Sequence, residues 1–372
     1  MSLSFDKLYS MGHEEVLFIS DASCGLKAII AIHDTTLGPA LGGTRMWSYA
    51  NEEEAVEDVL RLSKGMTYKA AVSGLNLGGG KAVIIGDPKT DKSEALFRSY
   101  GRFIESLNGR YITAEDVNIT VEDIEHIYTE TSFVTGVAKI HGGSGNPAPY
   151  TALGVYRGME ASCTKVFGNR SLKNKVVAIQ GVGSVGFELA KILDRSGAKI
   201  IYTDINERNI EKIKEEIPQA EFVSTNDIFE VKCDIYAPCA LGASINDKTI
   251  NRLNCKIVNG AANNQLAEDR HGQELRERGI LYAPDYLINA GGLMNVSIEF
   301  EGWNDSKSRR MIDTIYDTSL KIFAISDEEN IPVNKAADTL AERRLESIRR
   351  ISKSYLGNVG HRFPGRKNRH QR

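Results

Sequence analysis

Three consecutive glycines followed by a lysine, at residues 78–81, constrain this chain more than any other feature. Glycine loses the most conformational freedom on folding, so a triplet indicates unusual backbone angles or very close approach of another group. Lys81 opens an apolar run, AVII, which is typical of a buried strand. A lysine there is expected to lose water, and desolvation favours the neutral amine that a general base requires. The motif alone leaves open a surface lysine after a flexible turn.

Length and composition bound the class of protein. The chain has 372 residues, which suits two domains, and its 41% hydrophobic and 26% charged content is typical of soluble globular proteins. A net charge of −3 provides no general attraction for nucleic acid or membrane. No signal-peptide pattern or apolar run of roughly 18–20 residues is present. The five cysteines lack metal-site spacing, so we expect reduced thiols, no metal and a cytoplasmic protein.

The N-terminal part combines strands with amphipathic helices. Expected elements are a hairpin at 14–33, a loop or bulged strand at 35–47, a helix at 52–66, a strand at 82–85 and a helix at 93–107. Asp116 follows the strand RYIT, where α/β proteins gather reactive groups, although an ordinary turn aspartate is the alternative. Thr120 and Asp123 resemble a capping box that starts another helix.

A glycine fingerprint follows the Gly/Pro-rich loop at 141–149 and a helix expected at 151–167. A buried strand precedes Gly181, Gly183 and Gly186, and a second strand ends at Asp204, 23 positions after the first glycine. In this context the spacing predicts a dinucleotide site, because glycines let a pyrophosphate approach the N-terminus of a helix. An acid at position 204 suits a free ribose 2′-hydroxyl and would repel a 2′-phosphate, which favours NAD over NADP.

The remainder continues the same α/β pattern. Helices are expected at 207–215, 245–252, 306–327 and 334–356, strands at 220–223, 233–237 and 255–259, and loops at 238–242, 260–264 and near the end of 280–296. The tail from residue 357 carries basic residues and no acid. We expect a disordered tail there, with a nucleic-acid-binding arm as the alternative.

The predicted fold class is α/β, with an N-terminal α/β substrate domain, a doubly wound Rossmann domain and C-terminal helices packing back on the first domain. The expected boundaries are 1–146 for the substrate, catalytic and oligomerisation domain and 147–330 for the NAD-binding domain. Residues 331–356 would form a helix that returns to the first domain, and 357–372 would be the basic tail.

Several long runs carry a resemblance that covers nearly the whole chain outside that tail. They are GPALGGTRMW, GMTYKAAVSGLNLGGGKAVIIGDP, GRYITAEDV, GNPAPYTALGVYRGM, GVGSVG, DIYAPCALGA, GAANNQL and APDYLINAGG. In these runs the sequence resembles the glutamate/leucine/phenylalanine/valine dehydrogenase family, and within it the leucine-specific members. The resemblance implies reversible, NAD-dependent oxidative deamination of an L-amino acid to a 2-oxo acid and ammonia. It also implies a homo-oligomer, an octamer by analogy with the family.

The resemblance implies three polar roles. Lys81 resembles the lysine that activates water against the imino carbon, Lys69 the lysine that holds the substrate carboxylate, and Asp116 the acid that moves protons to and from the nitrogen. These roles are physically coherent, because a desolvated carboxylate needs a fixed cation and a second cation nearby favours a neutral lysine base.

The family resemblance also implies a largely apolar substrate pocket. Its lining would come from Leu41, Gly42, Met66, Ala114, Thr135, Pro147, Leu293 and Val296, and Asn263 would be a further contact to the substrate. Because no charge lies among them, the γ-carboxylate of glutamate would be buried unpaired, whereas a branched aliphatic side chain fits. The substrate is therefore expected to be L-leucine foremost, with valine and isoleucine. Leu293 departs from the valine expected in leucine enzymes, so phenylalanine or another aromatic substrate stays open.

The cofactor would bind in the second domain. The implied contacts are Thr151, Gly181, Val182, Gly183, Ser184, Val185, Gly186, Asp204, Ala240, Leu241 and Asn263. Gly186 stands where leucine enzymes often carry alanine. A non-catalytic NAD-binding regulatory protein is the alternative from another class, and the joint presence of Lys69, Lys81 and Asp116 argues against it.

Overall fold

The computed structural model describes residues 5–351, and these form two compact units. The first unit takes residues 5–146, 296–304 and 341–351, and the second takes 147–295 and 305–340. The chain therefore passes back into the first unit twice. The predicted basic tail, with the last residues of the helix expected at 334–356, lies outside the described part of the chain.

A six-stranded mixed sheet forms the centre of the first unit. Its strands are β1 (Glu15–Asp21), β2 (Leu26–Asp34), β3 (Ala40–Leu41), β4 (Thr44–Trp47), β5 (Gly78–Ile85) and β6 (Tyr111–Ile112). The order is β1-β2-β5-β3-β6, and β4 pairs with β5 beyond the point where β3 stops. β1 and β2 form the predicted hairpin, and β5 runs antiparallel to β2 and parallel to β3 and β4.

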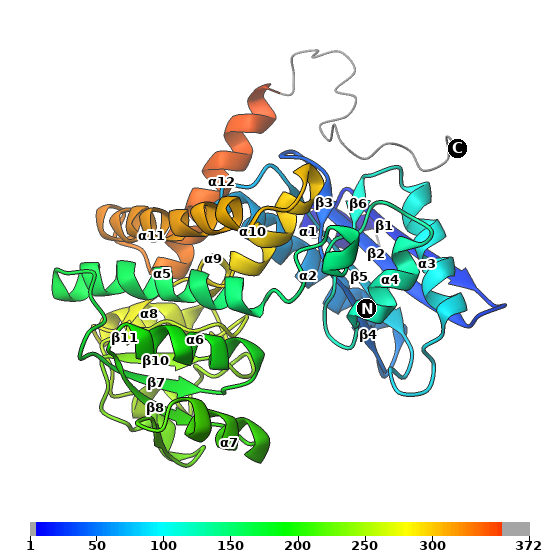
Figure 1. The fold of residues 1–372 in the computed structure, drawn as a ribbon. Helices are drawn as coiled ribbons and strands as arrows, with labels where there is room; N and C mark the ends of the chain where they lie inside the picture. The colour runs from blue at the N-terminus through cyan, green and yellow to red at the C-terminus, as the bar shows by residue number, and fades with distance from the viewer. Residues whose placement is uncertain (1–4, 352–372) are drawn as a thin grey trace. The chain divides into compact units, whose positions relative to one another are not determined.

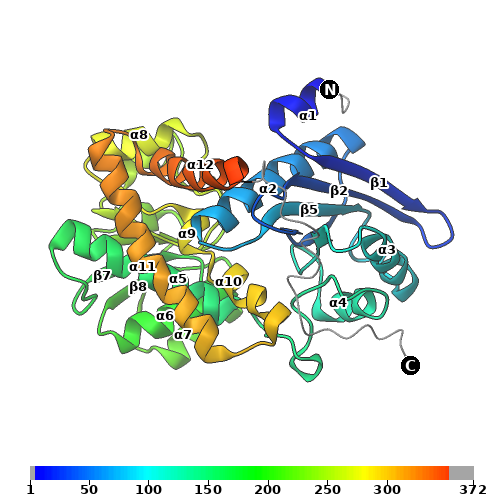
Figure 2. The same cartoon turned by 90° about the horizontal axis from the view of Figure 1, so that it is seen from above.

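Helices cover both faces of this sheet. They are α1 (Phe5–Met11), α2 (Glu52–Val72), α3 (Glu94–Ser106) and α4 (Val121–Tyr128), and Figure 2 shows α2 and the pair α3/α4 on opposite sides of it. Alternation along the strands explains this: Ile29 and Val83 pack with α2, whereas Ile30 and Ile84 pack with α3 and α4. The predicted capping box of Thr120 and Asp123 is present at the start of α4.

The strand predicted at 82–85 begins earlier than expected, because Gly78, Gly79 and Gly80 are the first three residues of the buried strand β5. Their backbone angles are ordinary for a strand, and close packing is what requires glycine. A Cβ at Gly79 would lie 2.1 Å from the backbone nitrogen of Thr67 on α2, and one at Gly80 would lie 2.7 Å from the Tyr111 ring. The triplet thus allows a helix to lie directly on the strand that carries Lys81.

A parallel six-stranded sheet forms the centre of the second unit. Its strands are β7 (Val176–Gln180), β8 (Lys199–Thr203), β9 (Glu221–Phe222), β10 (Ile235–Pro238), β11 (Ile257–Val258) and β12 (Leu281–Tyr282). The order β12-β11-β10-β7-β8-β9 winds outward in both directions from the neighbours β7 and β10. In such sheets, ligands bind at the carboxyl ends of the strands where the order reverses. The predicted doubly wound fold is confirmed.

Helices pack around this second sheet. They are α5 (Ala148–Phe167), α6 (Ser184–Arg195), α7 (Glu207–Glu216), α8 (Arg270–Glu277), α9 (Asp285–Ile288), α10 (Gly291–Ser297) and α11 (Asp305–Glu328), of which α5 and α11 run side by side (Figure 1). The short 3₁₀ helices η2 (Asp227–Phe229) and η3 (Ile250–Arg252) also belong to the second unit, whereas η1 (Lys139–His141) and η4 (Ile298–Glu301) belong to the first.

Two predicted elements of the second half are wrong. The helix expected at 245–252 is reduced to η3, because the Asn246 side chain accepts from the backbone N–H groups of Lys248 and Thr249 and forms a local turn instead. The loop expected near the end of 280–296 is occupied by α9 and α10. There Gly291 permits close approach, since a Cβ would lie 2.0 Å from the Tyr150 carbonyl oxygen.

The last helix, α12 (Val333–Ile351), returns the chain to the first unit. Its Arg344 donates to the carbonyl oxygens of Ala70, Ala71 and Gly74 and to the side chain of Asn76, at the C-terminal end of α2. A helix end leaves carbonyl groups without intrahelical partners, so this guanidinium satisfies them. Among the described residues, none of the helices has the length and apolar character that crossing a membrane demands.

Candidate active site

The first unit brings Lys81 and Asp116 into contact. The Lys81 Nζ lies 2.9 Å from the Asp116 Oδ2, and the lysine side chain is 6% exposed. Lys81 points to the face of β5 that α2 covers, as Val83 does, while Asp116 comes from the segment after β6. The pair therefore joins two segments that lie far apart in sequence, in a site largely shielded from water.

Arg45 and Asp58 extend this pair into a chain of charges that the sequence analysis missed. The Arg45 Nε donates to the same Asp116 Oδ2 at 3.0 Å, and its Nη1 donates to the Asp58 Oδ2 at 2.8 Å. Asp58, on α2, also accepts from the Tyr49 hydroxyl at 2.8 Å. The sequence does show an arginine inside the run GGTRMW. Its ion pair with Asp116, 71 positions away, cannot be predicted from a local sequence pattern.

The two cations determine the ionisation of Asp116. Burial alone would raise the pKa of this carboxyl, but the charges of Lys81 and Arg45 outweigh it and hold the pKa below its ordinary value. The neighbouring Glu115 shows the opposite behaviour, because burial and then repulsion from Asp123 and Glu299 raise its pKa. Two successive acids are thus driven in opposite directions by their surroundings.

The remaining sequence-predicted residues of the first unit surround this face of the sheet at varied depth. Lys69 and Met66 lie half-buried on α2, and Leu41 and Thr135 are buried. Gly42 is forced by packing, since a Cβ there would lie 1.7 Å from the Gly80 carbonyl oxygen. Ala114 is half-buried, and Val296, in α10, is buried and falls in the first unit. Leu41 lies in β3 and Gly42 follows it, Met66 and Lys69 lie on α2, Ala114 follows β6, and Thr135 lies in the segment after α4.

The glycine fingerprint forms the turn between β7 and α6 in the second unit. Gly181 has a φ of +93°, and a Cβ there would lie 2.7 Å from the Ala240 Cβ. A Cβ at Gly186 would lie 2.1 Å from the Gly181 carbonyl oxygen, so α6 begins in contact with the turn. At Gly183, by contrast, a Cβ would meet no atom within 4 Å. The open backbone before the first turn of α6 fits a pyrophosphate.

Asp204, at the end of β8, is fixed beside this turn. Its Oδ2 accepts from the backbone N–H of Val182 at 2.8 Å and from the Asn209 side chain at 3.2 Å, and its Oδ1 accepts from the backbone N–H of Asn206 at 2.8 Å. This arrangement joins the fingerprint turn to the end of the second strand. The surroundings of Asp204 fit the adenosine ribose of a nicotinamide dinucleotide.

The other sequence-predicted residues of the second unit occupy helix starts and loops. Pro147 immediately precedes α5, and Thr151 in its first turn donates to the Pro147 carbonyl oxygen at 3.2 Å. Asn263, exposed, accepts from the Asn289 side chain at 2.7 Å, and Leu293 in α10 is buried. Ser184 and Val185 begin α6, while Ala240 and Leu241 are exposed after β10.

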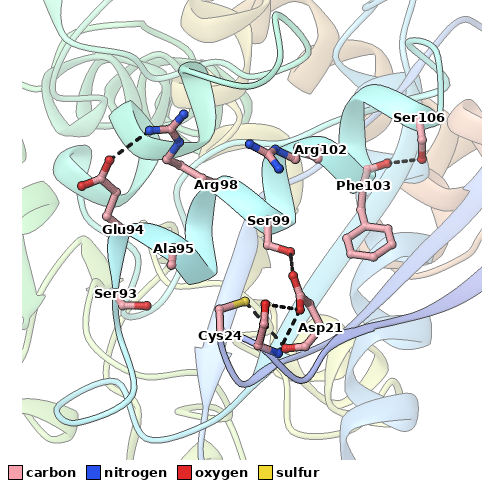
Figure 3. Close-up of a pocket in the computed structure, with 11 residues that line it drawn as sticks. Asp21, Cys24, Ser93, Glu94, Ala95, Arg98, Ser99, Arg102, Phe103 and Ser106 are labelled. Carbon is pink, nitrogen blue, oxygen red and sulfur yellow. Dashed lines mark hydrogen bonds and ion pairs between the residues drawn. The ribbon is translucent and has the colours of Figure 1, made fainter.

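A large surface pocket lies elsewhere in the first unit. Its volume is about 950 Å³, and it is lined by α3 and by the turn between β1 and β2, including Asp21, Cys24, Arg98 and Arg102 (Figure 3). Its polar groups pair with one another: Ser99 donates to Asp21 at 2.7 Å, and Arg98 binds Glu94. None of the residues predicted for catalysis lines this pocket.

Acids and a histidine also gather around α8. The donor atoms of Asp247, His271 and Glu274 lie within 4.8 Å of one another. Arg270 already pairs with both carboxylates, and the His271 Nδ1 accepts from the backbone N–H of Glu268, which leaves its Nε2 to donate to Asp247. The cluster is an ion-paired helix start rather than a set of free ligands.

Two family models match the sequence. Residues 13–133 match the Glu/Leu/Phe/Val dehydrogenase dimerisation domain, and residues 201–350 match Glutamate/Leucine/Phenylalanine/Valine dehydrogenase. The matched regions contain Lys69, Lys81 and Asp116 in the first unit and Asp204 in the second. Enzymes of this family are dehydrogenases, which implies a nicotinamide cofactor.

Relatives match over nearly the whole chain. A leucine dehydrogenase of Thermoactinomyces intermedius is 57% identical over 95% of this chain and 96% of its own length, and a phenylalanine dehydrogenase of Caldalkalibacillus thermarum is 47% identical over 94% and 95%. The crystal structure of L-tryptophan dehydrogenase from Nostoc punctiforme, 45% identical, covers 93% of this chain and 100% of its own with a TM-score of 0.83. This chain therefore belongs to the glutamate/leucine/phenylalanine/valine dehydrogenase family.

Proposed function

We propose that the protein catalyses reversible, NAD-dependent oxidative deamination of apolar branched-chain L-amino acids, with L-leucine as the main substrate and valine and isoleucine as further ones. The observation that carries the proposal is the buried contact of 2.9 Å between Lys81 and Asp116. It occurs in a chain 57% identical to a leucine dehydrogenase and 47% identical to a phenylalanine dehydrogenase. The products are the 2-oxo acid and ammonia.

Three side chains of the first unit have separate roles in the proposed reaction. Lys69 binds the substrate carboxylate, which needs a fixed cation once it leaves water. Lys81, in its neutral form, takes a proton from the water that attacks the imino carbon. Asp116, in contact with Lys81, moves protons to and from the substrate nitrogen, so that ammonia can leave. In the reverse direction the same groups assist addition of ammonia to the 2-oxo acid.

NAD is the cofactor that the second unit supports. The turn with Gly181, Gly183 and Gly186 would hold the pyrophosphate, and Asp204 would hold the adenosine ribose, where the 2′-phosphate of NADP would meet its charge. When bound, NAD would supply the acceptor for the hydride of the substrate α-carbon, and the protein would supply binding and orientation. Thr151, Ala240, Leu241 and Asn263 would complete the contacts to the dinucleotide.

The side-chain pocket determines the substrate. The predicted lining is Leu41, Gly42, Met66, Ala114, Thr135, Pro147, Leu293 and Val296, in which no charge would pair with the side chain of glutamate. Leu293, longer than the valine expected in a leucine enzyme, reshapes the pocket floor and supports an aromatic L-amino acid as the second candidate. We also propose a homo-oligomer, an octamer by analogy with the family.

A substrate panel tests the proposal. The purified protein would be assayed for NADH absorbance with leucine, isoleucine, valine, phenylalanine, tryptophan and glutamate, each over a range of concentrations. We expect the highest kcat/KM with leucine and no measurable turnover of glutamate. A higher kcat/KM with phenylalanine or tryptophan would establish the second candidate, and no turnover of any apolar amino acid would reject the proposed activity.

Substitutions in the same assay test the roles. Lys81→Ala should lower kcat by about 10²–10⁴-fold while NAD still binds, as should Asp116→Asn, because an amide cannot carry the proton. Lys69→Ala should mainly raise the KM for the amino acid. A fall of less than tenfold for Lys81→Ala would remove that lysine from the role of base, and an unchanged KM for Lys69→Ala would mean that another group holds the carboxylate.

A further inference from the structure

We propose that Arg45 is a positioning residue that holds Asp116 in place and compensates its charge while Lys81 changes between its charged and neutral forms. This inference rests on the proposed roles of Lys81 and Asp116 in deamination. It arises from one geometric observation: a single carboxylate oxygen, Asp116 Oδ2, accepts from Lys81 Nζ at 2.9 Å and from Arg45 Nε at 3.0 Å.

The two cations come from neighbouring strands. β4 and β5 are parallel partners, and Arg45 lies opposite Val83 in their register. Lys81 and Val83 occupy the same face of β5, so Arg45 projects to the face that also carries Lys81. The two side chains therefore approach Asp116 from a rigid, hydrogen-bonded pair of strands.

A second carboxylate fixes the guanidinium. The Arg45 Nη1 donates to Asp58 at 2.8 Å, and Asp58 is itself held by Tyr49 at 2.8 Å and by Arg61 at 3.0 Å. Arg45 and Asp58 are both shielded, with side chains 22% and 15% exposed. Because a guanidinium is planar, two partners on different nitrogens determine both its place and its orientation.

The chemistry requires such a residue. A base lysine must be neutral when it takes a proton, and a neutral amine leaves an adjacent carboxylate without its counter-charge. Arginine stays protonated at any working pH, so Arg45 keeps Asp116 paired through both states of Lys81.

In the described part of the chain, the charged and titratable groups that act on Asp116 come from several elements. Lys81 faces Asp116 from β5 and Arg45 from β4, and Asp58 on α2 acts on it through Arg45. The charge of Asp116 also acts on Tyr49 and on the buried Tyr111 of β6, and Glu115 precedes Asp116 in sequence. Arg45 is thus the cation beside Asp116 whose charge does not change during the proposed reaction.

Arg45→Gln tests the inference with L-leucine and NAD across pH. We expect kcat to fall by about 10–100-fold, with a smaller change in the KM for leucine. Without the guanidinium the Asp116 carboxyl binds a proton more readily, so the acidic limb of the kcat profile should move to higher pH. Arg45→Lys keeps the positive charge but loses the planar guanidinium that binds two carboxylates. It should therefore return the acidic limb to its wild-type position, with a kcat between those of the wild type and Arg45→Gln.

Arg61→Gln is the matched control. It removes a cation from the same carboxylate, Asp58, at a more exposed position that does not contact Asp116, so the acidic limb should stay in place. If Arg45→Gln fails to fold, Asp58→Asn replaces it as the test, because it removes the second carboxylate that holds Arg45 but keeps Arg45 itself. In that variant kcat should fall several-fold with little change in KM.

The outcomes separate this inference from the proposed function. Wild-type protein that does not turn over any apolar amino acid rejects the function. Active wild type with unchanged kcat and pH profile in Arg45→Gln, or unchanged kcat in Asp58→Asn where that variant is used, overturns the positioning role. A loss of kcat without movement of the acidic limb, and without recovery of that limb in Arg45→Lys, would also overturn it, since a merely structural arginine would behave that way.

Discussion

Asp204 accepts hydrogen bonds on both carboxylate oxygens and still borders the fingerprint turn. With NADP its charge would face a phosphate, at a cost on the order of 1 kcal/mol or more near contact. We expect a strong preference for NAD over NADP. Asp204→Ser should reduce this preference, chiefly by lowering the affinity for NAD. Parallel titrations of wild type and variant with both cofactors measure this, with the exposed Asp227→Ser as control. Equal use of NADP by the wild type would contradict the assignment of Asp204 to the ribose.

Single residues differ in how readily sequence identifies them. Lys81 and Asp204 lie at the ends of apolar runs, which are visible in the sequence because burial leaves a pattern of period two or a continuous run. Arg45 carries no such mark. Its importance arises from contacts with Asp58 and Asp116, which belong to a helix and to a segment after another strand. Contacts of this kind depend on the fold and cannot be derived from spacing.

At the scale of elements, the packing of α2 on β5 depends on glycine. Gly79→Ala should lower the free energy of unfolding by about 1–3 kcal/mol, because a Cβ 2.1 Å from Thr67 would push the helix off the strand. Gly65→Ala, on the exposed side of α2, is the control. A Cβ there would meet no atom within 4 Å, so this substitution should raise the free energy of unfolding by up to about 1 kcal/mol. Both tryptophans, Trp47 and Trp303, belong to the first unit, so urea unfolding followed by their fluorescence reports it. Equal stabilities of the two variants would contradict this account.

Two buried histidines also anchor α2. His13 contacts Ser63 at 2.8 Å, His33 contacts Thr67 at 2.8 Å, and their rings lie 4.8 Å apart. Burial lowers the pKa of each to about 4, and His13 further lowers that of His33. The unfolded chain takes up protons near pH 6.5 and the folded one only near pH 4. Stability is therefore complete above pH 6.5 and lost as the pH falls to 4, by on the order of 3 kcal/mol for each histidine.

This loss can be measured by urea unfolding with tryptophan fluorescence at pH 7.5 and at pH 4.5. The double variant His13→Gln/His33→Gln should lose much less stability between the two pH values than the wild type does, whatever its absolute stability. His126→Gln, on α4, is the matched substitution outside the pair and should retain the wild-type loss. A wild type whose stability is the same at both values would show that the pair is not buried in the neutral form.

Element prediction succeeded where periodicity agreed with local signals and failed where a side chain competed with the backbone. The hairpin of β1 and β2, the start of α4 and the unit from β7 to β8 were predicted correctly for that reason. The side chain of Asn246 forms a local turn in place of the helix expected at 245–252. The glycine triplet lies in a strand because close contacts with neighbouring residues, rather than its own torsion angles, require glycine.

At the scale of the whole molecule, the first unit depends on a helix near the end of the described chain. Arg344→Met removes four hydrogen bonds to the end of α2 and to Asn76, and should lower the free energy of unfolding by about 1–3 kcal/mol. Arg350→Met is the control, because Arg350 is exposed and pairs with Glu346 on its own helix. Urea unfolding of the first unit distinguishes them, and equal stability of both variants would show that the contacts of Arg344 contribute nothing measurable. The sequence predicts that residues 331–356 return to the first domain, but it does not identify Arg344 as the side chain that contacts the end of α2.

The three-segment construction of the first unit has a consequence for synthesis. A ribosome produces the strands of this unit first, yet residues 296–304 and 341–351 emerge only after most of the second unit has been made. Glu299, which accepts from the backbone N–H groups of Gly136 and Ser144, and Arg344, which binds the end of α2, arrive late. The segment that carries Lys81 and Asp116 is thus translated early, but the first unit can be completed only after most of the second unit has been translated.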